Sequence, residues 1–188
     1  MFISDADLTT ILDERQMAQV IAISESNRKR AEDFATSEAT SYLNFKFDTD
    51  AIFTFEVFDY SININYKEGQ IIVDDSATAY TCILNAPAGT ALSDDTYFES
   101  KDGRNPLIVM IVVDLLAYHL FSKIPYNSIP EHIKERYKEA ITKLKNIRVG
   151  KMNPLLPIKQ IDSDEEQDPN RQTHTITILS NPKRSNFY

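Results

Sequence analysis

Residues 105–152 constrain the fold more than any other part of the chain, because they join a very apolar segment to a strongly charged one. Asn105 can cap a helix, and Pro106 suits its first turn, where a missing N–H costs no hydrogen bond. Residues 107–121 are then apolar except for Asp114 and one histidine, as in a helix that is buried on nearly all sides. The predicted helix has about fifteen residues, whereas a bilayer span requires roughly twenty. We therefore expect a core helix and no membrane contact.

A strand is the alternative for the start of this apolar segment, because β-branched residues favour β structure. These residues are Ile108, Val109, Ile111, Val112 and Val113. The length of the run, the Asn105 cap and the Leu-Leu-Ala sequence at 115–117 favour the helix. After a turn, residues 131–149 carry apolar side chains at helical spacing, and Gly150 can end this second helix. The sequence thus predicts a helical hairpin with one buried and one surface helix.

The first 45 residues are also predicted to be helical. Ser4 and Asp7 form a capping-box pattern, which begins a short first helix. Two further helices are expected at residues 14–23 and 28–43. The third helix has a stripe of small residues, which would let the apolar helix of the hairpin pack closely against it. The small residues are Ala31, Ala35 and Ala39.

Residues 46–103 have the composition of β structure. Strands are predicted at residues 51–58, 60–66, 70–74 and 79–84, and a run rich in turn residues follows. We therefore expect an α+β fold. In this fold, a helical domain of residues 1–45 and 104–152 carries a small inserted antiparallel β module of residues 46–103.

Residues 153–188 are predicted to form an extended C-terminal tail. Pro154 and Pro157 prevent a helix from continuing, and the five acids at residues 162–168 indicate a solvated linker. Residues 173–179 alternate like a strand but have no neighbouring segment to pair with, so we expect this strand to add to the sheet of another chain. The predicted docking residues are Thr173, Thr175, Ile176, Thr177, Ile178, Leu179, Lys183, Arg184, Phe187 and Tyr188. We expect the isolated chain to be a monomer that assembles only on its partner, since an exposed strand must be kept from self-association.

Composition argues against nucleic-acid recognition and catalysis. The net charge is −8, and the one locally basic stretch, residues 131–151, is interpreted as a solvated or protein-contacting face. His119, His132 and His174 lie in different predicted elements, and neither a metal-ligand spacing nor a phosphate-binding glycine motif occurs. Cys82 is the single cysteine, which excludes an internal disulfide and fits a reducing cytosol. We predict no catalytic, cofactor-binding or metal-binding residues and no enzymatic activity.

Asp114 is a carboxylate in the middle of the apolar helix, where a charge must find a partner. A catalytic role is conceivable, but a structural one is favoured. The partner would be Tyr118 one turn later or a basic side chain from another helix. Asp114 and Tyr118 are therefore predicted to be buried polar residues with a structural role.

A series of motifs runs in order through the two helical parts of the chain. It begins with Asp7-Leu8 and a helix ending in Ala39, Tyr42 and Leu43. It continues with Asp114, Ala117, Tyr118 and Leu120, and it closes with Ile133, Arg136, Tyr137, Ala140, Ile141, Leu144, Ile147, Gly150 and Lys151. This series resembles the head–tail connector proteins of tailed bacteriophages, also called adaptor or head-completion proteins.

The resemblance implies a structural virion protein at the neck of the particle, made in the host cytoplasm, that binds the portal protein. The absence of a stretch typical of a secretion signal agrees with this location. The resemblance also implies a homo-oligomeric ring of about twelve copies, in which each subunit presents a different face to each neighbour. Packaged DNA would pass through the ring without sequence-specific binding, because an acidic wall repels it. The tail would grip the portal or another neck or tail ring protein.

The long insert departs from this family. It resembles a small carbohydrate-binding module of the chitin-binding type. The matching positions are Tyr66, Gly69, Ile71, Val73, Tyr80, Cys82, Gly89, Thr90, Asp95, Tyr97 and Phe98. Such modules stack exposed aromatic rings, usually tryptophan, on sugars, and this chain has no tryptophan. We therefore expect Tyr80, Tyr97 and Phe98 to be core residues and the insert to contact other neck or tail proteins. A glycan-binding accessory protein is the alternative function.

Overall fold

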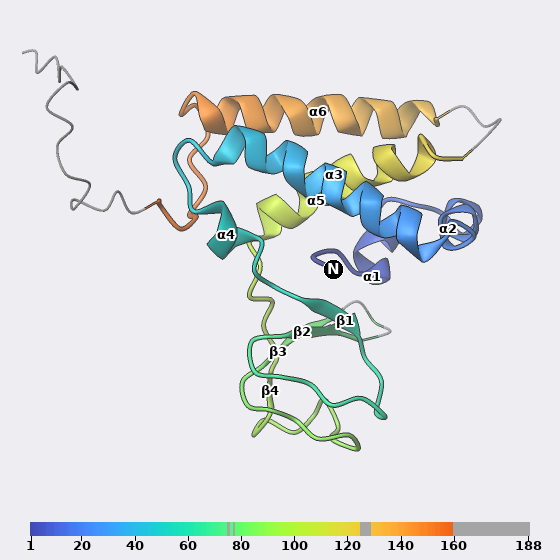
Figure 1. Ribbon diagram of the computed structural model, residues 1–188, viewed down its shortest axis with the longest axis vertical. Helices are drawn as coiled ribbons and strands as arrows, with labels where there is room; N and C mark the ends of the chain where they lie inside the picture. Colours follow the sequence, from blue (N-terminus) through green and yellow to red (C-terminus); the bar gives the residue numbers. More distant parts are fainter. Residues whose placement is uncertain (75, 77, 125–128, 160–188) are drawn as a thin grey trace, which may run out of the picture.

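The computed structural model describes residues 1–74, 76, 78–124 and 129–159. The helices in these ranges are α1 (Asp5–Thr9), α2 (Glu14–Ile21), α3 (Glu25–Leu43), α4 (Thr49–Ile52), α5 (Pro106–Phe121) and α6 (Glu131–Arg148). The strands are β1 (Val57–Asp59), β2 (Ile71–Val73), β3 (Ala79–Cys82) and β4 (Phe98–Glu99). The long helices pack together in the upper part of Figure 1, and the small sheet lies below them. The predicted α+β fold class is confirmed.

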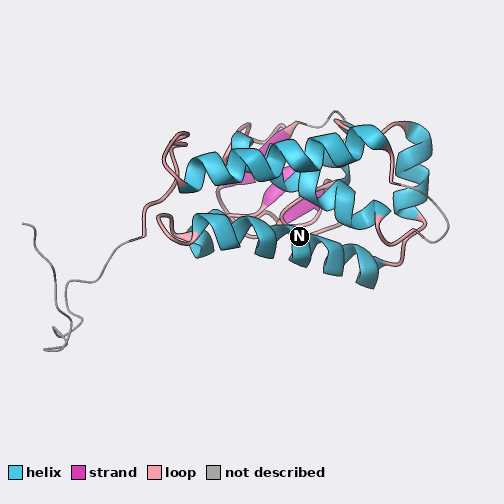
Figure 2. Ribbon diagram, turned by 90° about the horizontal axis from the view of Figure 1, so that it is seen from above, coloured by secondary structure: helices cyan, strands magenta, loops and turns pink. Residues whose placement is uncertain are grey.

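Helices α5 and α6 form the predicted hairpin. Asn105 caps α5 as expected: its side-chain oxygen accepts hydrogen bonds from the backbone N–H groups of Leu107 at 3.0 Å and Ile108 at 3.3 Å. Ten of the sixteen residues of α5 are buried, so this helix is the centre of the core. Helix α6 buries only one face, in agreement with its amphipathic pattern. Figure 2 shows the helices from above, with the sheet behind them.

Helix α3 packs on both helices of the hairpin through its stripe of alanines. Ala31, Ala35 and Ala39 are fully buried, and their small side chains allow the helices to approach closely. The helix begins at Glu25, earlier than predicted. Ser24 stands at the N-cap, although its side chain makes no capping hydrogen bond.

The sheet has the strand order β1-β2-β3-β4 and is mixed, so the predicted antiparallel arrangement is wrong for one strand pair. β1 and β2 are parallel, with Val57 opposite Ile71, whereas β2–β3 and β3–β4 are antiparallel. The parallel pair arises because residues 60–70 form a long connection that returns the chain to the edge where β1 started.

The predicted strand at residues 60–66 is wrong, because this segment forms turns and only Tyr66 makes a bridge, to Ala86. The N–H of Ser61 donates to the Tyr66 hydroxyl at 2.7 Å, and the side-chain oxygen of Asn65 accepts from the backbone N–H of Ala88 at 2.6 Å. Hydrogen bonds between side chains and backbone therefore replace the strand ladder that the alternating pattern predicts.

Other boundaries in this region also differ from the prediction. Part of the predicted strand 51–58 is helix α4, which Asp48 caps by accepting a hydrogen bond from the N–H of Ala51 at 3.0 Å. Strand β4 lies beyond the predicted strands, after the turn-rich run. The strands predicted at 70–74 and 79–84 are confirmed as β2 and β3.

The helices and the sheet each have a hydrophobic cluster, and a further cluster of Val57, Ile71 and Val73 lies between them, with Ala6 of α1 packed against it. Phe47 and Ile52 belong to the helical cluster, although they fall within residues 46–103. The main cluster of the sheet contains Tyr66, Ile72, Cys82, Ala86 and Phe98, with Tyr80 and Tyr97 packed against it. Tyr80, Tyr97 and Phe98, the aromatic residues that were expected in this core, are therefore found there.

The described chain ends beside α3 and α4. Phe47 and Ile158 form an isolated antiparallel bridge, and the N–H of Asp48 donates to the carbonyl of Pro157 at 3.0 Å. The predicted acidic linker at 162–168, the predicted strand at 173–179 and the predicted docking residues up to Tyr188 lie outside the described residues.

Candidate functional site

Cysteine and histidine often act as nucleophiles, bases or metal ligands, and Cys82 and His132 each contact a neighbouring polar group of the fold. Cys82 is buried and donates its S–H to the carbonyl of Leu84 at 2.9 Å, and burial raises the pKa of its thiol. Nε2 of His132 lies 3.4 Å from the side-chain amide of Gln16. Within the described residues, no group of His, Cys, Asp or Glu could hold a metal ion, and no helix is long and apolar enough to cross a membrane.

Asp114 lies in the hairpin interface. It is 2% exposed, and Nε of Arg136 on α6 donates to its Oδ1 at 2.8 Å. Burial raises the pKa of the Asp114 carboxyl, although the charge and hydrogen bond of Arg136 act to lower it. Of the two partners considered from the sequence, the structure has the basic side chain from another helix. Tyr118, which was predicted to be buried, is half-buried and stacks on Tyr137, with ring centroids 4.1 Å apart.

Glu38 joins all three long helices through one carboxylate. The hydroxyl of Tyr137 on α6 donates to Glu38 Oε1 at 2.7 Å, and Nε2 of His119 on α5 lies 3.1 Å from Oε2. Burial and the hydrogen bond to Glu38 raise the pKa of Tyr137. The cluster fixes the hairpin on α3, and all three side chains remain half-buried at its surface.

Residues 1–4 form an anchor between the helices and the sheet. The N–H of Val57 on β1 donates to the carbonyl of Met1 at 2.8 Å. On the other side, the Glu32 carboxylate on α3 accepts hydrogen bonds from the N–H groups of Phe2 and Ile3. Burial raises the pKa of Glu32, which is 5% exposed.

Arg104 completes this anchor from the segment before α5. Its Nη1 donates to the carbonyl of Phe2 and to Oδ2 of Asp7, each at 2.8 Å, and its Nε donates to Oδ1 of Asp102 at 3.0 Å. Burial acts to lower the pKa of Arg104, but the hydrogen bonds and charges of Asp102 and Asp7 outweigh it and raise the pKa. Sequence reasoning missed both Glu32 and Arg104. The one signal was the position of Glu32 inside the stripe of buried alanines on α3.

One surface lies where the chain leaves the helices. We call it the tail-side end and define it as residues 44–47 and 145–159. Its most exposed apolar side chains are Phe45 (81% exposed), Val149 (66%), Leu155 (93%) and Ile158 (66%). The two segments are joined by hydrogen bonds from the N–H of Lys159 to the carbonyl of Lys46 at 3.2 Å, and from Nζ of Lys46 to the Asn153 side chain at 2.6 Å.

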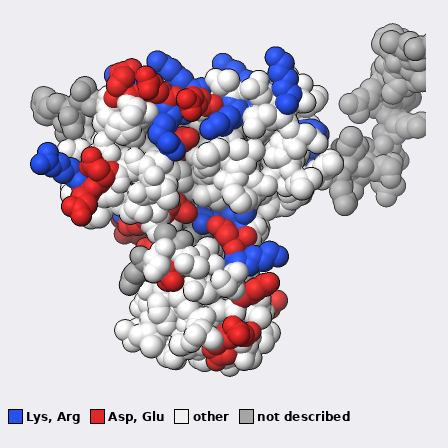
Figure 3. Space-filling model, turned by 180° about the vertical axis from the view of Figure 1, so that it is seen from behind, with Lys and Arg blue, Asp and Glu red and all other residues white. Residues whose placement is uncertain are grey.

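The tail-side end is also basic. Residues 145–159 contain four Lys or Arg and no Asp or Glu, and residues 44–47 add Lys46. The right-hand end of the helices in Figure 3 is accordingly white and blue on the face shown. This combination of exposed apolar and basic side chains is typical of a protein contact surface.

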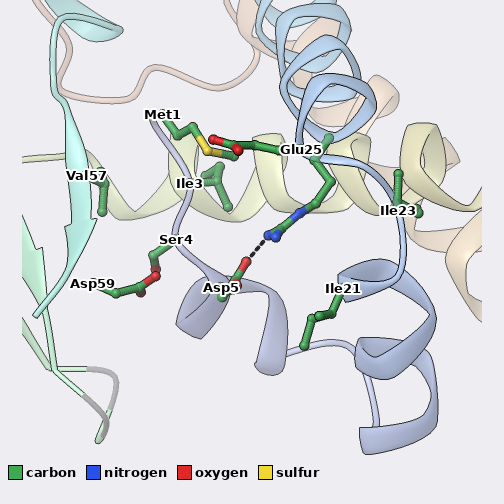
Figure 4. Close-up of a pocket in the computed structure, with 10 residues that line it drawn as sticks. Met1, Ile3, Ser4, Asp5, Ile21, Ile23, Glu25, Val57 and Asp59 are labelled. Carbon is green, nitrogen blue, oxygen red and sulfur yellow. Dashed lines mark hydrogen bonds and ion pairs between the residues drawn. The ribbon is translucent and has the colours of Figure 1, made fainter.

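A second surface is a cavity of about 320 Å³, which we call the N-terminal pocket. Its apolar lining includes Met1, Ile3, Ile21, Ile23 and Val57. Its charged lining is Asp5, Glu25, Asp59 and Arg28. Figure 4 shows these side chains converging from the N-terminal segment, α1, the α2–α3 turn and β1, with the ion pair of Asp5 and Arg28 dashed. The lining of the pocket is therefore about half apolar, and its charged side chains are three carboxylates and one guanidinium.

The second half of the chain is similar to a bacteriophage protein. Residues 104–174 match the family described as Bacteriophage Mu, Gp36. The match includes the whole α5–α6 hairpin and leaves out the sheet and α1 to α4. No curated protein and no solved structure matches the chain. The match supports a bacteriophage protein of the structural or morphogenetic class.

Proposed function

We propose that this chain is a structural virion protein, a subunit of the head–tail connector ring that docks on the portal and continues the DNA channel toward the tail. The single observation that carries the proposal is the match of residues 104–174 to the Mu Gp36 family. It agrees with the resemblance to connector proteins, because the motifs at Asp114–Leu120 and Ile133–Lys151 lie in the matched hairpin. The proposed role requires no catalysis.

The arrangement of the chain is compatible with a ring subunit. The hairpin and α3 pack into one helical unit. Buried alanines of α3 and the hydrogen bonds of the Glu38 side chain stabilise it. The sheet lies to one side of this unit, where it would decorate the ring and contact other neck or tail proteins (Figure 1). The net charge of −8 suits a channel through which DNA slides without being held.

The first test is electron microscopy of the chain co-expressed with the portal protein of its own genome. We expect a ring of about twelve copies stacked on the portal, since closed rings are the usual product of heterologous contacts. Free portals beside unattached chains would contradict the proposal. Images of the portal alone provide the control.

A truncation tests the role of the tail. Deleting residues 173–188 removes the predicted docking strand and the terminal residues with their two cations and two aromatics. We expect portal binding to be lost while the urea unfolding curve of the remaining chain stays unchanged, because main-chain pairing would supply the binding energy. A loss of folding in the truncated chain would mean that the strand belongs to its own core. Replacing the acidic residues 162–168 with Gly and Ser is the matched control, and it should preserve binding.

The glycan-binding alternative gains no support from the sheet. In the described part of residues 51–99, every aromatic side chain is buried or half-buried. Tyr66 and Phe98 contact each other edge to face at 6.1 Å inside the cluster of the sheet. Sugar stacking requires an exposed ring face, so a glycan array should show no binding.

A further inference from the structure

We propose that the tail-side end of one copy docks into the N-terminal pocket of the next copy. The inference rests on the proposed function, because it names the contact between neighbouring subunits of the ring. The occupant of the pocket is a second copy of this chain.

The two surfaces complement each other in polarity. Leu155 and Phe45 are the most exposed large apolar residues of the described chain, at 93% and 81%. The apolar half of the pocket lining is also incompletely covered, since Ile21 is 59% exposed and Met1 is 47% exposed. Contact between them would remove both sets of apolar side chains from water, which is the main driving force of association.

The two surfaces also complement each other in charge. The tail-side end carries five Lys or Arg, namely Lys46 and the four in residues 145–159, and no Asp or Glu. The pocket has three carboxylates, from Asp5, Glu25 and Asp59, against two cations, the Arg28 guanidinium and the α-ammonium of Met1. Opposite charges around an apolar centre favour this pairing and disfavour contact between two tail-side ends or two pockets.

The positions of the two surfaces suit a ring. Glu25 in the pocket is the first residue of α3, and the tail-side end begins just after the last, Leu43. The helix has 19 residues and is about 28 Å long, so the surfaces lie at opposite ends of the helical unit (Figure 1). Surfaces at opposite ends of one subunit form heterologous, head-to-tail contacts, and such contacts close into rings when the rotation allows.

Another apolar surface lacks such a counterpart. Ile62, Ile64, Ile83 and Leu84 are 38–52% exposed. Residues 60–66 and 79–93 around them contain no charged side chain, so no charge pattern identifies a partner. This surface serves instead as a control for apolar exposure.

The test is solution NMR with two variants of the full chain. The first is ¹⁵N-labelled Leu155→Asp, which keeps its pocket but has an impaired tail-side end. The second is unlabelled Ile21→Asp, which has an impaired pocket and an intact tail-side end. Both residues are exposed, so the substitutions should not disturb folding, and the spectra report this directly. NMR also detects a weak contact, which is enough when a portal holds neighbouring copies close together.

We expect the unlabelled Ile21→Asp chain to shift the labelled amide signals of pocket residues such as Ser4, Ile23 and Glu25. The double variant Ile21→Asp/Leu155→Asp should give no shifts. The matched control, Ile21→Asp/Leu84→Asp, should act like Ile21→Asp, because it replaces an exposed leucine outside the proposed contact. The proposal is overturned if no pocket signal shifts at millimolar concentration, or if the double variant shifts the same signals.

Electron microscopy with the portal separates this inference from the proposed function. If the unmodified chain forms a ring on the portal and Leu155→Asp does not, both stand. If Leu155→Asp forms the same ring, the contact lies elsewhere and this inference fails, while the proposed function holds. If the pocket signals shift but the unmodified chain forms no ring on the portal, the contact stands and the proposed function fails.

Discussion

At the scale of single residues, Glu32 is the clearest case of a buried group whose ionisation makes the stability of the fold depend on pH. One of its oxygens accepts hydrogen bonds from Phe2 and Ile3, and the other has no hydrogen-bond partner among the described residues. Burial disfavours the charged form, so the pKa of the carboxyl lies above its ordinary value of 4.5. The stability of the anchor should therefore vary with pH.

The substitution Glu32→Gln keeps an acceptor for both N–H groups and removes the titration. Because the folded pKa is raised, the contribution of Glu32 to stability is fully present below its ordinary pKa of 4.5 and decreases as the pH rises through the folded pKa. We expect the free energy of unfolding of Glu32→Gln, relative to that of the unmodified chain, to increase across this window and then level off. Urea unfolding at a series of pH values measures the difference.

The variant Glu32→Ala provides the contrast, because it leaves two buried N–H groups without an acceptor. It should lower the free energy of unfolding by about 1–3 kcal/mol. A Glu32→Gln difference that does not change with pH would show that the carboxyl titrates normally in the fold.

Asp114 and Arg136 are buried to very different degrees, with side chains 3% and 39% exposed. Arg136→Ala leaves a buried carboxylate unpaired and should cost about 2 kcal/mol, below the usual range for a broken buried pair because water can reach the site. Asp114→Asn keeps an acceptor for Arg136 and should cost less than about 1 kcal/mol. Chemical unfolding of both variants tests this order, and an equal loss would contradict it. Lys134→Ala, which removes an exposed ion pair with Glu131, is the control and should not change stability.

At the scale of elements, the helices were predictable where their signals are local. The Asn105 cap and the apolar run specify α5, and helical spacing specifies α6. The strands were less predictable, because β1 and β2 pair in parallel across a long connection and β4 has only two residues. Residues 60–66 alternate like a strand, yet side-chain hydrogen bonds hold them in turns. Local sequence patterns thus predicted the helices, whose backbone hydrogen bonds stay within each helix.

The alanine stripe of α3 gives a prediction about helix packing. Ala39 is fully buried in the helical cluster. Ala39→Leu adds three heavy atoms to a packed interface and should lower the free energy of unfolding by about 1–3 kcal/mol through overpacking. Ser37→Leu, on the exposed face of the same helix, is the matched control and should have little effect. Thermal and urea unfolding of the two variants measure the contrast, and equal stability would mean that the helices can separate at no cost.

At the scale of the whole molecule, the anchor decides how the sheet sits on the helices. It joins residues 1–4 to Val57 on β1, to Glu32 on α3 and to Arg104 before α5. These partners are up to 102 residues apart in the sequence, so no local pattern reveals them. The same holds for the N-terminal pocket, which forms only when the N-terminal segment, the α2–α3 turn and β1 come together. The candidate surfaces therefore required the structure, whereas the hairpin did not.

The substitution Arg104→Met tests whether the anchor links the helices to the sheet. The Arg104 side chain is 1% exposed, and Arg104→Met keeps the apolar stem but removes the hydrogen bonds that Arg104 donates to Asp7, Asp102 and the carbonyl of Phe2. We expect a loss of about 3 kcal/mol in the free energy of unfolding, as for other broken buried ion pairs. Hydrogen exchange should also become faster at the N–H groups of residues 1–9 and of Val57, and should change less in α5 and α6. Arg15→Met, at an exposed position on α2, should leave both measurements unchanged. Uniformly faster exchange in Arg104→Met would mean that the helices and the sheet unfold as one unit and that the anchor is not a separate link.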